Sequence, residues 1–238
     1  MTAVVLQARL DSSRLPKKAL LDLGGKPVIF RVMQALDNIP CDLKILACPQ
    51  DSLGAFSTLA DEAGFKVFAG PKDDVLERYC MVIRKYSIDR VIRATGDNPF
   101  VFADAACAIN SEAASLNADY SGFLNLPYGA GVESVAASAL LRAACEAKLQ
   151  QEREHVCPYL YNHQEIFKIH RPHAPDCWNF PNIRLTIDTQ EDYKNASILY
   201  AALKNEPLQY NGSTIINTYQ NINSKTSGLK KCLEDSKV

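Results

Sequence analysis

The sequence predicts an α/β protein built on a doubly wound, mostly parallel β-sheet. Short apolar segments alternate with amphipathic ones through the first half of the chain. Such alternation is typical of strands that are buried on both faces and connected by covering helices. The chain has 238 residues, 47% of them hydrophobic, which is enough for one large domain with a substantial core.

The expected elements of the first half follow one another without a long interruption. The run of apolar, β-branched residues at 3–8 predicts a buried strand, and Val28, Val32 and Leu36 share one face of a helix. Ser52 is a plausible N-cap for the next helix. In order, we expect strands at 3–8, 43–48, 65–68 and 89–94, and helices at 27–36, 52–63, 73–86 and 104–116.

The second half is less regular, and its expected strands are shorter. Strand candidates lie at 120–124, 131–136, 166–170 and 183–187, and helices at 139–149, 154–162 and 191–203. No linker or internal repeat divides the chain, so residues 1–220 are expected to form one domain. The polar segment 221–238, rich in Lys and Ser, is expected to be a disordered tail.

Charge and composition argue against several function classes. The formal net charge is −1, which does not favour a nucleic acid or an anionic membrane as a partner. The sequence shows neither a signal-peptide pattern nor an apolar run long enough to span a bilayer, so a cytoplasmic location is expected. The eight cysteines are scattered without a C-x-x-C pair, as expected of reduced thiols.

A cluster of cations follows the first expected strand. Residues 9–18 contain Arg9, Arg14, Lys17 and Lys18 but a single acidic residue, Asp11. Ligands of α/β proteins bind at the carboxyl ends of strands, where this loop is expected to lie. Arg, Lys and Ser together offer the donors that a triphosphate needs. A solvated basic loop is the alternative interpretation.

Two aspartates are candidate ligands for Mg²⁺. Asp97 follows Gly96 at one strand end, and Asp188 follows the expected strand 183–187. Mg²⁺ prefers oxygen ligands and commonly takes one or two carboxylates together with phosphates and water. Each aspartate also has a purely structural interpretation, because Asp97 is a common turn residue before Asn-Pro and Asp188 is a plausible N-cap.

Other motifs are weaker. The chain has neither the Walker A pattern nor G-x-G-x-x-G, which argues against a P-loop NTPase and a classical dinucleotide dehydrogenase. His170, His173 and Cys177 have loose spacing and no obvious fourth zinc ligand, so incidental loop residues are favoured. Cys157 lacks an argued base partner. The segment around His155 is either substrate-facing or the polar start of a helix.

Five ordered blocks over about residues 3–200 resemble the cytidylyltransferases that make CMP-activated acidic sugars. Within that superfamily they are most similar to the SpsF-type branch of spore-coat polysaccharide biosynthesis, and related to the CMP-KDO and CMP-sialic acid synthetases. The blocks are QARLDSSRLPKKALLDLGGKP at 7–27, DDVLERY at 73–79, RATGDNP at 93–99, REHV at 153–156 and RLTIDTQED at 184–192.

The resemblance implies a fold and an activity. The fold would be the Rossmann-like, three-layer sandwich of the nucleotide-diphospho-sugar transferases, with a nucleotide-binding half at about 1–118 and an acceptor-binding half at about 119–220. The activity would be Mg²⁺-dependent transfer of CMP from CTP to an acidic sugar or a phosphorylated acceptor, with release of pyrophosphate. Many relatives dimerise, so a homodimer is compatible with the resemblance, although no stretch identifies an interface.

The resemblance also implies roles for individual residues. Arg14, Lys18 and Asp97 would be catalytic, and Asp97 and Asp188 would hold Mg²⁺. The nucleotide would contact Leu6, Gln7, Ala8, Arg9, Ser12, Arg14, Lys18, Asp74, Arg78, Arg93, Thr95 and Gly96. The acceptor would contact Glu133, Arg153, His155 and Arg184.

One residue departs from the family pattern, which usually has Gly directly before the matched lysine, Lys18. Here that position is Lys17. Two other function classes stay open at this point. A glycosyltransferase with a nucleotide-sugar donor would normally have a D-x-D-like motif, whereas Gly96-Asp97-Asn98 offers one carboxylate. A catalytically silent nucleotide-binding module is disfavoured because phosphate-binding cations and both metal carboxylates are present.

Overall fold

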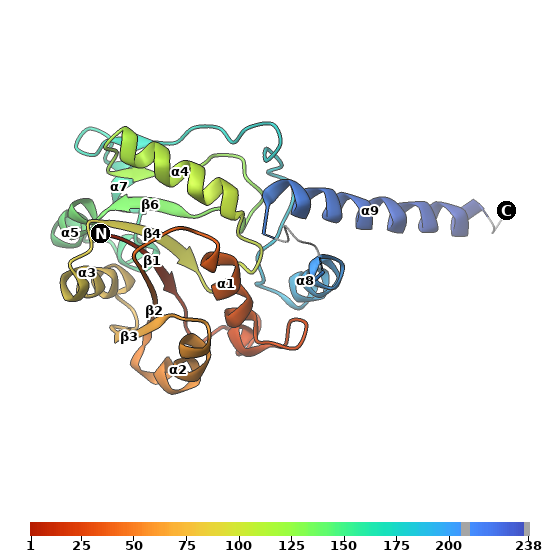
Figure 1. The fold of residues 1–238 in the computed structure, drawn as a ribbon, viewed down its shortest axis with the longest axis horizontal. Helices are drawn as coiled ribbons and strands as arrows, with labels where there is room; N and C mark the ends of the chain where they lie inside the picture. The colour runs from red at the N-terminus through yellow and green to blue at the C-terminus, as the bar shows by residue number, and fades with distance from the viewer. Residues whose placement is uncertain (206–209, 236–238) are drawn as a thin grey trace.

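The computed structural model describes residues 1–205 and 210–235, and in these residues a seven-stranded sheet is the central layer (Figure 1). The strand order is β3-β2-β1-β4-β6-β5-β7, and β6 runs antiparallel to both of its neighbours while the other pairs are parallel. The strands are β1 (Thr2–Gln7), β2 (Leu43–Pro49), β3 (Lys66–Gly70), β4 (Arg90–Thr95), β5 (Tyr120–Ser121), β6 (Glu133–Ala136) and β7 (Ile169–His170).

Alternating residues of the central strands point into two separate cores. In β1, Val4 and Leu6 enter one core, whereas Ala3 and Val5 enter the other, and all four are completely buried. The first core is covered by α1 (Val28–Asp37), α2 (Leu53–Glu62), α4 (Ala103–Ser115), α8 (Gln190–Leu203) and the start of α9 (Gly212–Asp235). The second is covered by α3 (Val75–Tyr86), α5 (Ala137–Glu146), α6 (Gln150–His155) and α7 (Pro158–Asn162).

These two helical layers around a mostly parallel sheet confirm the predicted fold class. Ser52 differs from expectation, because it lies in a short 3-10 helix, Gln50–Ser52, and makes no side-chain cap bond to α2. Its hydroxyl instead accepts a hydrogen bond from the Leu10 amide at 3.3 Å. Among the residues that the structure describes, no helix is long and apolar enough to cross a membrane.

The expected strand at 183–187 is not a strand. Its backbone bonds go to two loops: the Leu185 amide donates to the Tyr128 carbonyl at 2.8 Å, and the Ile187 amide to the Asp97 carbonyl at 2.9 Å. Apolar alternation predicts an extended segment but does not say whether its neighbour is a strand or a loop. The segment still ends beside β4, so Asp188 reaches the expected place by another route.

The expected helix at 154–162 is two helices, α6 and α7. Val156 between them has φ 74° and ψ −56°, and the Cys157 amide donates to the His155 carbonyl at 2.9 Å. These values describe a γ-turn, which is strained for a β-branched residue. Pro158 then occupies the first turn of α7, where its missing N–H is harmless.

The polar segment from residue 221 was expected to be disordered, and it instead continues α9 as far as Asp235. The helix has a firm start, because Ile215 and Ile216 are buried and the Asn211 side chain accepts the Ser213 amide at 3.1 Å. Once a first turn is fixed, each further residue adds a hydrogen bond at low cost. Figure 1 shows α9 extending away from the sheet. Residues 236–238 of the expected tail lie outside the described residues.

Candidate active site

A cleft of about 460 Å³ opens at the carboxyl ends of β1 and β4. The loop after β1 forms one wall, and the turn after β4 and the segment before α8 form the opposite wall. Parallel strands place their carboxyl ends at one edge, which explains why these distant segments meet. The cleft is lined by most of the expected site residues: Gln7, Ala8, Arg9, Ser12, Arg14, Lys18, Arg78, Arg93, Thr95, Gly96, Asp97, His155 and Asp188.

The loop after β1 makes its tightest bend at Lys17, which has φ 52° and ψ 30°. This left-handed conformation favours glycine, because a side chain there is crowded against the backbone. The departure from the family pattern therefore falls at a bend whose conformation glycine adopts more easily than lysine. The 3-10 helix Lys18–Leu20 follows directly and directs Lys18 into the cleft.

We expect Lys17→Gly to stabilise the protein. Glycine removes the strain of the left-handed conformation, which stabilises the folded state, and it increases the entropy of the unfolded chain, which costs less. The free energy of unfolding should therefore rise by roughly 0.5–1 kcal/mol. Urea unfolding of the wild type and the variant measures this difference. Lys17→Ala is the control, because it removes the same charge and retains the strain; a gain for Ala equal to that for Gly would contradict the explanation.

Lys18 connects the two candidate metal aspartates. Its Nζ lies 2.9 Å from Asp97 Oδ2 and 2.9 Å from Asp188 Oδ1. Burial by itself lowers the pKa of Lys18, but Asp97 and Asp188 outweigh it and leave that pKa raised. The ammonium is therefore charged, and it marks the point on which both carboxylates converge.

Asp188 is held by further cations. Its side chain is 10% exposed, with Arg14 Nη2 at 3.2 Å from Oδ1 and Arg184 Nη2 at 2.8 Å from Oδ2. Burial raises its pKa, but Lys18, Arg14 and Arg184 bring the pKa below its ordinary value. The structural alternative for Asp188 does not apply, because Thr189 is the N-cap of α8 and accepts the Asp192 amide at 3.2 Å.

Asp97 combines a turn role with a half-buried carboxylate at the cleft. The Thr95 hydroxyl donates to Asp97 Oδ1 at 2.7 Å, and the Asn98 amide donates to the Thr95 carbonyl at 3.3 Å. This local bonding is what the turn interpretation predicts. The other oxygen, Oδ2, faces Lys18, so Asp97 serves both the turn and the cleft.

Two arginines line the floor of the cleft. Arg78 is 2% exposed, and its Nη1 donates to the Pro71 carbonyl at 2.6 Å. Its Nε has no hydrogen-bond partner among the residues that the structure describes. Arg93 donates through Nε to Gln7 Oε1 at 3.1 Å and pairs with Glu133. A buried guanidinium with an unused donor is costly to maintain. Arg78 and Arg93 therefore bring two guanidinium groups to the lining of the cleft, and each is held in place by protein acceptors.

Sequence comparison identifies the family. A family model described as cytidylyltransferase matches residues 3–225. The chain belongs to the cytidylyltransferase family. It is 33% identical over 214 residues to the spore coat polysaccharide biosynthesis protein SpsF of Bacillus subtilis (strain 168), covering 85% of this chain and 88% of that protein. The expected SpsF-type resemblance and a CTP-dependent nucleotidyltransferase activity are thereby confirmed.

Solved structures show the same fold. A cytidylyltransferase from Leptospira borgpetersenii serovar Hardjo-bovis (strain JB197) has a TM-score of 0.84 at 22% identity, with 95% of each chain covered. A CMP:2-keto-3-deoxy-manno-octonic acid synthetase complexed with CTP has a TM-score of 0.64 at 15% identity, covering 84% of this chain and 98% of that one. These structures agree with the predicted Rossmann-like sandwich.

Several expected site residues of this cytidylyltransferase lie outside the cleft lining, namely Leu6, Asp74, Glu133, Arg153 and Arg184. Leu6 is completely buried in the core. Arg153 donates through Nε to Asp74 at 2.7 Å and through Nη1 to the Ala144 carbonyl at 3.0 Å, so it joins α3, α5 and α6. Arg184 stacks on the Tyr128 ring, 4.9 Å from its centroid.

Several lining residues were not among the expected site residues, and Tyr128 and Gly129 are two of them. Tyr128 is 60% exposed at the cleft, and Gly129 follows it with φ 93°. The Ala130 amide donates to the Pro127 carbonyl at 3.0 Å, so Gly129 is the third residue of a β-turn that needs positive φ. Pro-Tyr-Gly is a turn signal, but nothing local indicates that the turn lies against β4.

The donor set fits a divalent cation in one place. Asp97 and Asp188 direct oxygens to one point in a cleft open to phosphate and water, as Mg²⁺ requires. No group of three potential ligands occurs among the described residues, and the two histidines of the zinc alternative have separate partners. His170 contacts Glu112 at 2.8 Å, and His173 contacts Asn125 at 3.0 Å.

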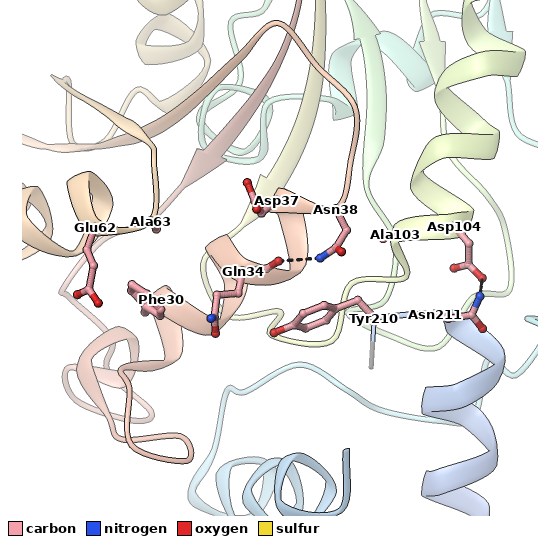
Figure 2. A pocket seen from close by; sticks show the side chains of 10 residues that line it. All are labelled: Phe30, Gln34, Asp37, Asn38, Glu62, Ala63, Ala103, Asp104, Tyr210 and Asn211. Atoms are coloured by element: carbon pink, nitrogen blue, oxygen red, sulfur yellow. Dashed lines mark hydrogen bonds between the residues drawn. The ribbon is translucent and has the colours of Figure 1, made fainter. Parts of the chain in front are cut away.

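A second cavity of about 540 Å³ lies between α1, α2 and the start of α4 (Figure 2). Its described lining residues include Asp37, Glu62 and Asp104 but no Lys or Arg. Figure 2 shows the dashed bond from Asn211 to Asp104, which occupies one of these carboxylates. Glu62 and Asp37 pair with Lys26 and Lys44, and the described lining itself contributes carboxylates rather than cations. The cleft at the strand ends, which cations line, is therefore the candidate nucleotide site.

Proposed function

We propose that the enzyme transfers CMP from CTP to an acidic sugar or another surface-polysaccharide precursor, with Mg²⁺ as cofactor. The observation that carries this proposal is the convergence of Lys18, Asp97 and Asp188 at the centre of the cleft. Cations and paired carboxylates at one point suit a metal-bound triphosphate. The name of the Bacillus relative, a spore coat polysaccharide biosynthesis protein, supports the acceptor class.

The nucleotide side of the cleft has two parts in this proposal. Arg9, Arg14 and Lys18 bind the phosphates, with the Ser12 hydroxyl as a further donor, because arginine forks and a lysine point charge match phosphate oxygens. Gln7, Ala8, Arg78, Arg93, Thr95 and Gly96 receive the base and ribose on the floor. Leu6 and Asp74 act by supporting these positions from outside the lining.

On the acceptor side of the cleft, His155 belongs to the lining. Glu133, Arg153 and Arg184 lie outside the lining. Glu133 fixes Arg93, Arg153 fixes α6, and Arg184 fixes both Asp188 and Tyr128. These three residues position groups that touch the ligands.

The reaction is an in-line displacement. An acceptor oxygen bonds to the α-phosphorus, the bond from that phosphorus to the bridging oxygen breaks, and pyrophosphate leaves while the hydroxyl proton passes to water. Arg14 and Lys18 stabilise the charge that develops on the pyrophosphate. Asp97 and Asp188 would hold Mg²⁺, which when bound would supply Lewis-acid polarisation of the phosphate oxygens. The protein contributes positioning and charge neutralisation, with no covalent intermediate.

Pyrophosphate release tests the proposal. The wild type is screened with the four nucleoside triphosphates and a panel of acidic sugars, with and without Mg²⁺. We expect release with CTP, Mg²⁺ and one acceptor class, and loss of release in Lys18→Ala and Asp97→Ala. Undiminished turnover of CTP in either variant would contradict the assigned roles, and turnover with neutral acceptors alone would contradict the acceptor class.

A further inference from the structure

In the structure, cationic and hydroxyl donors lie on the oxygens of the proposed metal carboxylates. Lys18 and Arg14 share Asp188 Oδ1, Arg184 holds Asp188 Oδ2, and Lys18 also holds Asp97 Oδ2. The remaining oxygen, Asp97 Oδ1, accepts the Thr95 hydroxyl at 2.7 Å. A cation that enters this site must therefore displace a group of the protein.

Lys18 is the group that occupies the point between the two carboxylates. Its ammonium is the only one of these cations, in the described part of the chain, with contacts to both carboxylates. At 2.9 Å from each, it lies where a shared metal would bind, and its positive charge repels a second cation over this distance. Of the two carboxylates, Arg14 and Arg184 pair with Asp188 and, in the part of the chain that the structure describes, not with Asp97, so they leave the point between the carboxylates open.

Lys18 is also able to leave. A lysine has a flexible four-carbon stem and three rotatable donors, so its ammonium can exchange one set of oxygens for another. A triphosphate brings several negative charges to the same cleft wall, which Lys18 shares with Arg9 and Arg14. Transfer of the ammonium to phosphate oxygens keeps Lys18 paired and exposes the carboxylates.

We propose that Lys18 is the internal counter-ion of Asp97 and Asp188, and that these carboxylates accept a divalent cation only after a triphosphate draws the ammonium away. This assignment rests on the proposed function and adds an order of binding to it. It makes Lys18 a positioning residue before catalysis as well as a phosphate ligand during it.

The direct test is Mn²⁺ binding in the absence of nucleotide. Binding is measured by water-proton relaxation, which responds to Mn²⁺ that tumbles with the protein. The wild type should bind weakly, and Lys18→Met should bind at least about tenfold tighter because the carboxylates lose their counter-ion. Lys17→Met is the matched control, since it removes a neighbouring positive charge and leaves Lys18 in place; it should behave as the wild type. Structural damage to the site would weaken Mn²⁺ binding. A higher Mn²⁺ affinity in Lys18→Met is therefore due to removal of the ammonium.

The outcomes separate the two proposals. Equal Mn²⁺ affinity in the wild type and Lys18→Met, or an equal gain in Lys17→Met, would overturn the role of Lys18 while CTP turnover stands. If Lys18→Met does not fold, wild-type enzyme with and without α,β-methylene-CTP decides: the relaxation signal should appear only with the analogue, and a signal without it overturns the inference. No protein-bound Mn²⁺ even with the analogue would overturn the metal role in the proposed function itself.

Discussion

Asp188→Asn should reduce kcat/KM by at least about 100-fold, because Lewis-acid stabilisation of a phosphoryl transition state is worth several kcal/mol. The substitution retains the shape of the side chain and removes its charge. Asp188 forms ion pairs with Lys18, Arg14 and Arg184 at once, so the neutral amide leaves three cations around a poor partner. The free energy of unfolding should fall by about 2 kcal/mol as these charge-assisted bonds weaken.

Thr189→Ala separates the two effects. Thr189 adjoins Asp188 and caps α8 through the Asp192 amide, so its loss costs about 1 kcal/mol of stability and leaves the carboxylate in place. Pyrophosphate release and urea unfolding of both variants are the measurements. Turnover that falls equally in Thr189→Ala and Asp188→Asn would show that local destabilisation, rather than loss of the carboxylate, controls the rate.

The first half of the fold could be predicted because its signals are local. Strand β1 carries a continuous apolar run because both of its faces are buried, and covering helices such as α1 and α3 have an apolar face. The second half lacks such signals. Strands β5 and β7 have two residues each, and their pairing depends on segments far away along the chain.

The candidate site was predictable where its residues follow strand ends. The cations of residues 9–18 follow β1, and Asp97 follows β4, so a parallel sheet brings them together. The partners of an arginine are not predictable in this way. Arg153 carries the charge expected of a substrate ligand, yet its guanidinium is saturated by Asp74 and by two carbonyls of the protein. Charge indicates what a side chain can bind, and packing decides where it points.

Gly129 is a backbone position whose surroundings could not be predicted from the sequence. Its substitution by alanine is the second change for which we expect a large effect. A Cβ at this position would lie 2.7 Å from the Thr186 amide nitrogen and 2.9 Å from Asn98 Oδ1. The nearest of these atoms is backbone and cannot rotate away. With φ 93° the residue is also in a conformation that an L side chain disfavours. Gly129→Ala should therefore lose about 3 kcal/mol of stability, from backbone strain and overpacking together.

The same substitution should lower turnover, because the two displaced atoms adjoin the proposed metal ligands. Asn98 follows Asp97 directly, and Thr186 lies two residues before Asp188. A shift of these segments by a fraction of an ångström to 1 Å separates carboxylates that must converge, and misplacement on that scale can cost about 100-fold in rate.

Gly25→Ala is the matched control for Gly129→Ala. Gly25 has a similar φ of 87°, but a Cβ there would meet no atom of the described residues within 4 Å, so only the backbone strain of about 1–2 kcal/mol applies. Urea unfolding and pyrophosphate release should show a larger stability loss in Gly129→Ala and a loss of turnover in that variant alone. Equal losses in both variants would mean that the glycine is required for its backbone conformation, and that close approach to Thr186 and Asn98 adds nothing to the geometry of the active site.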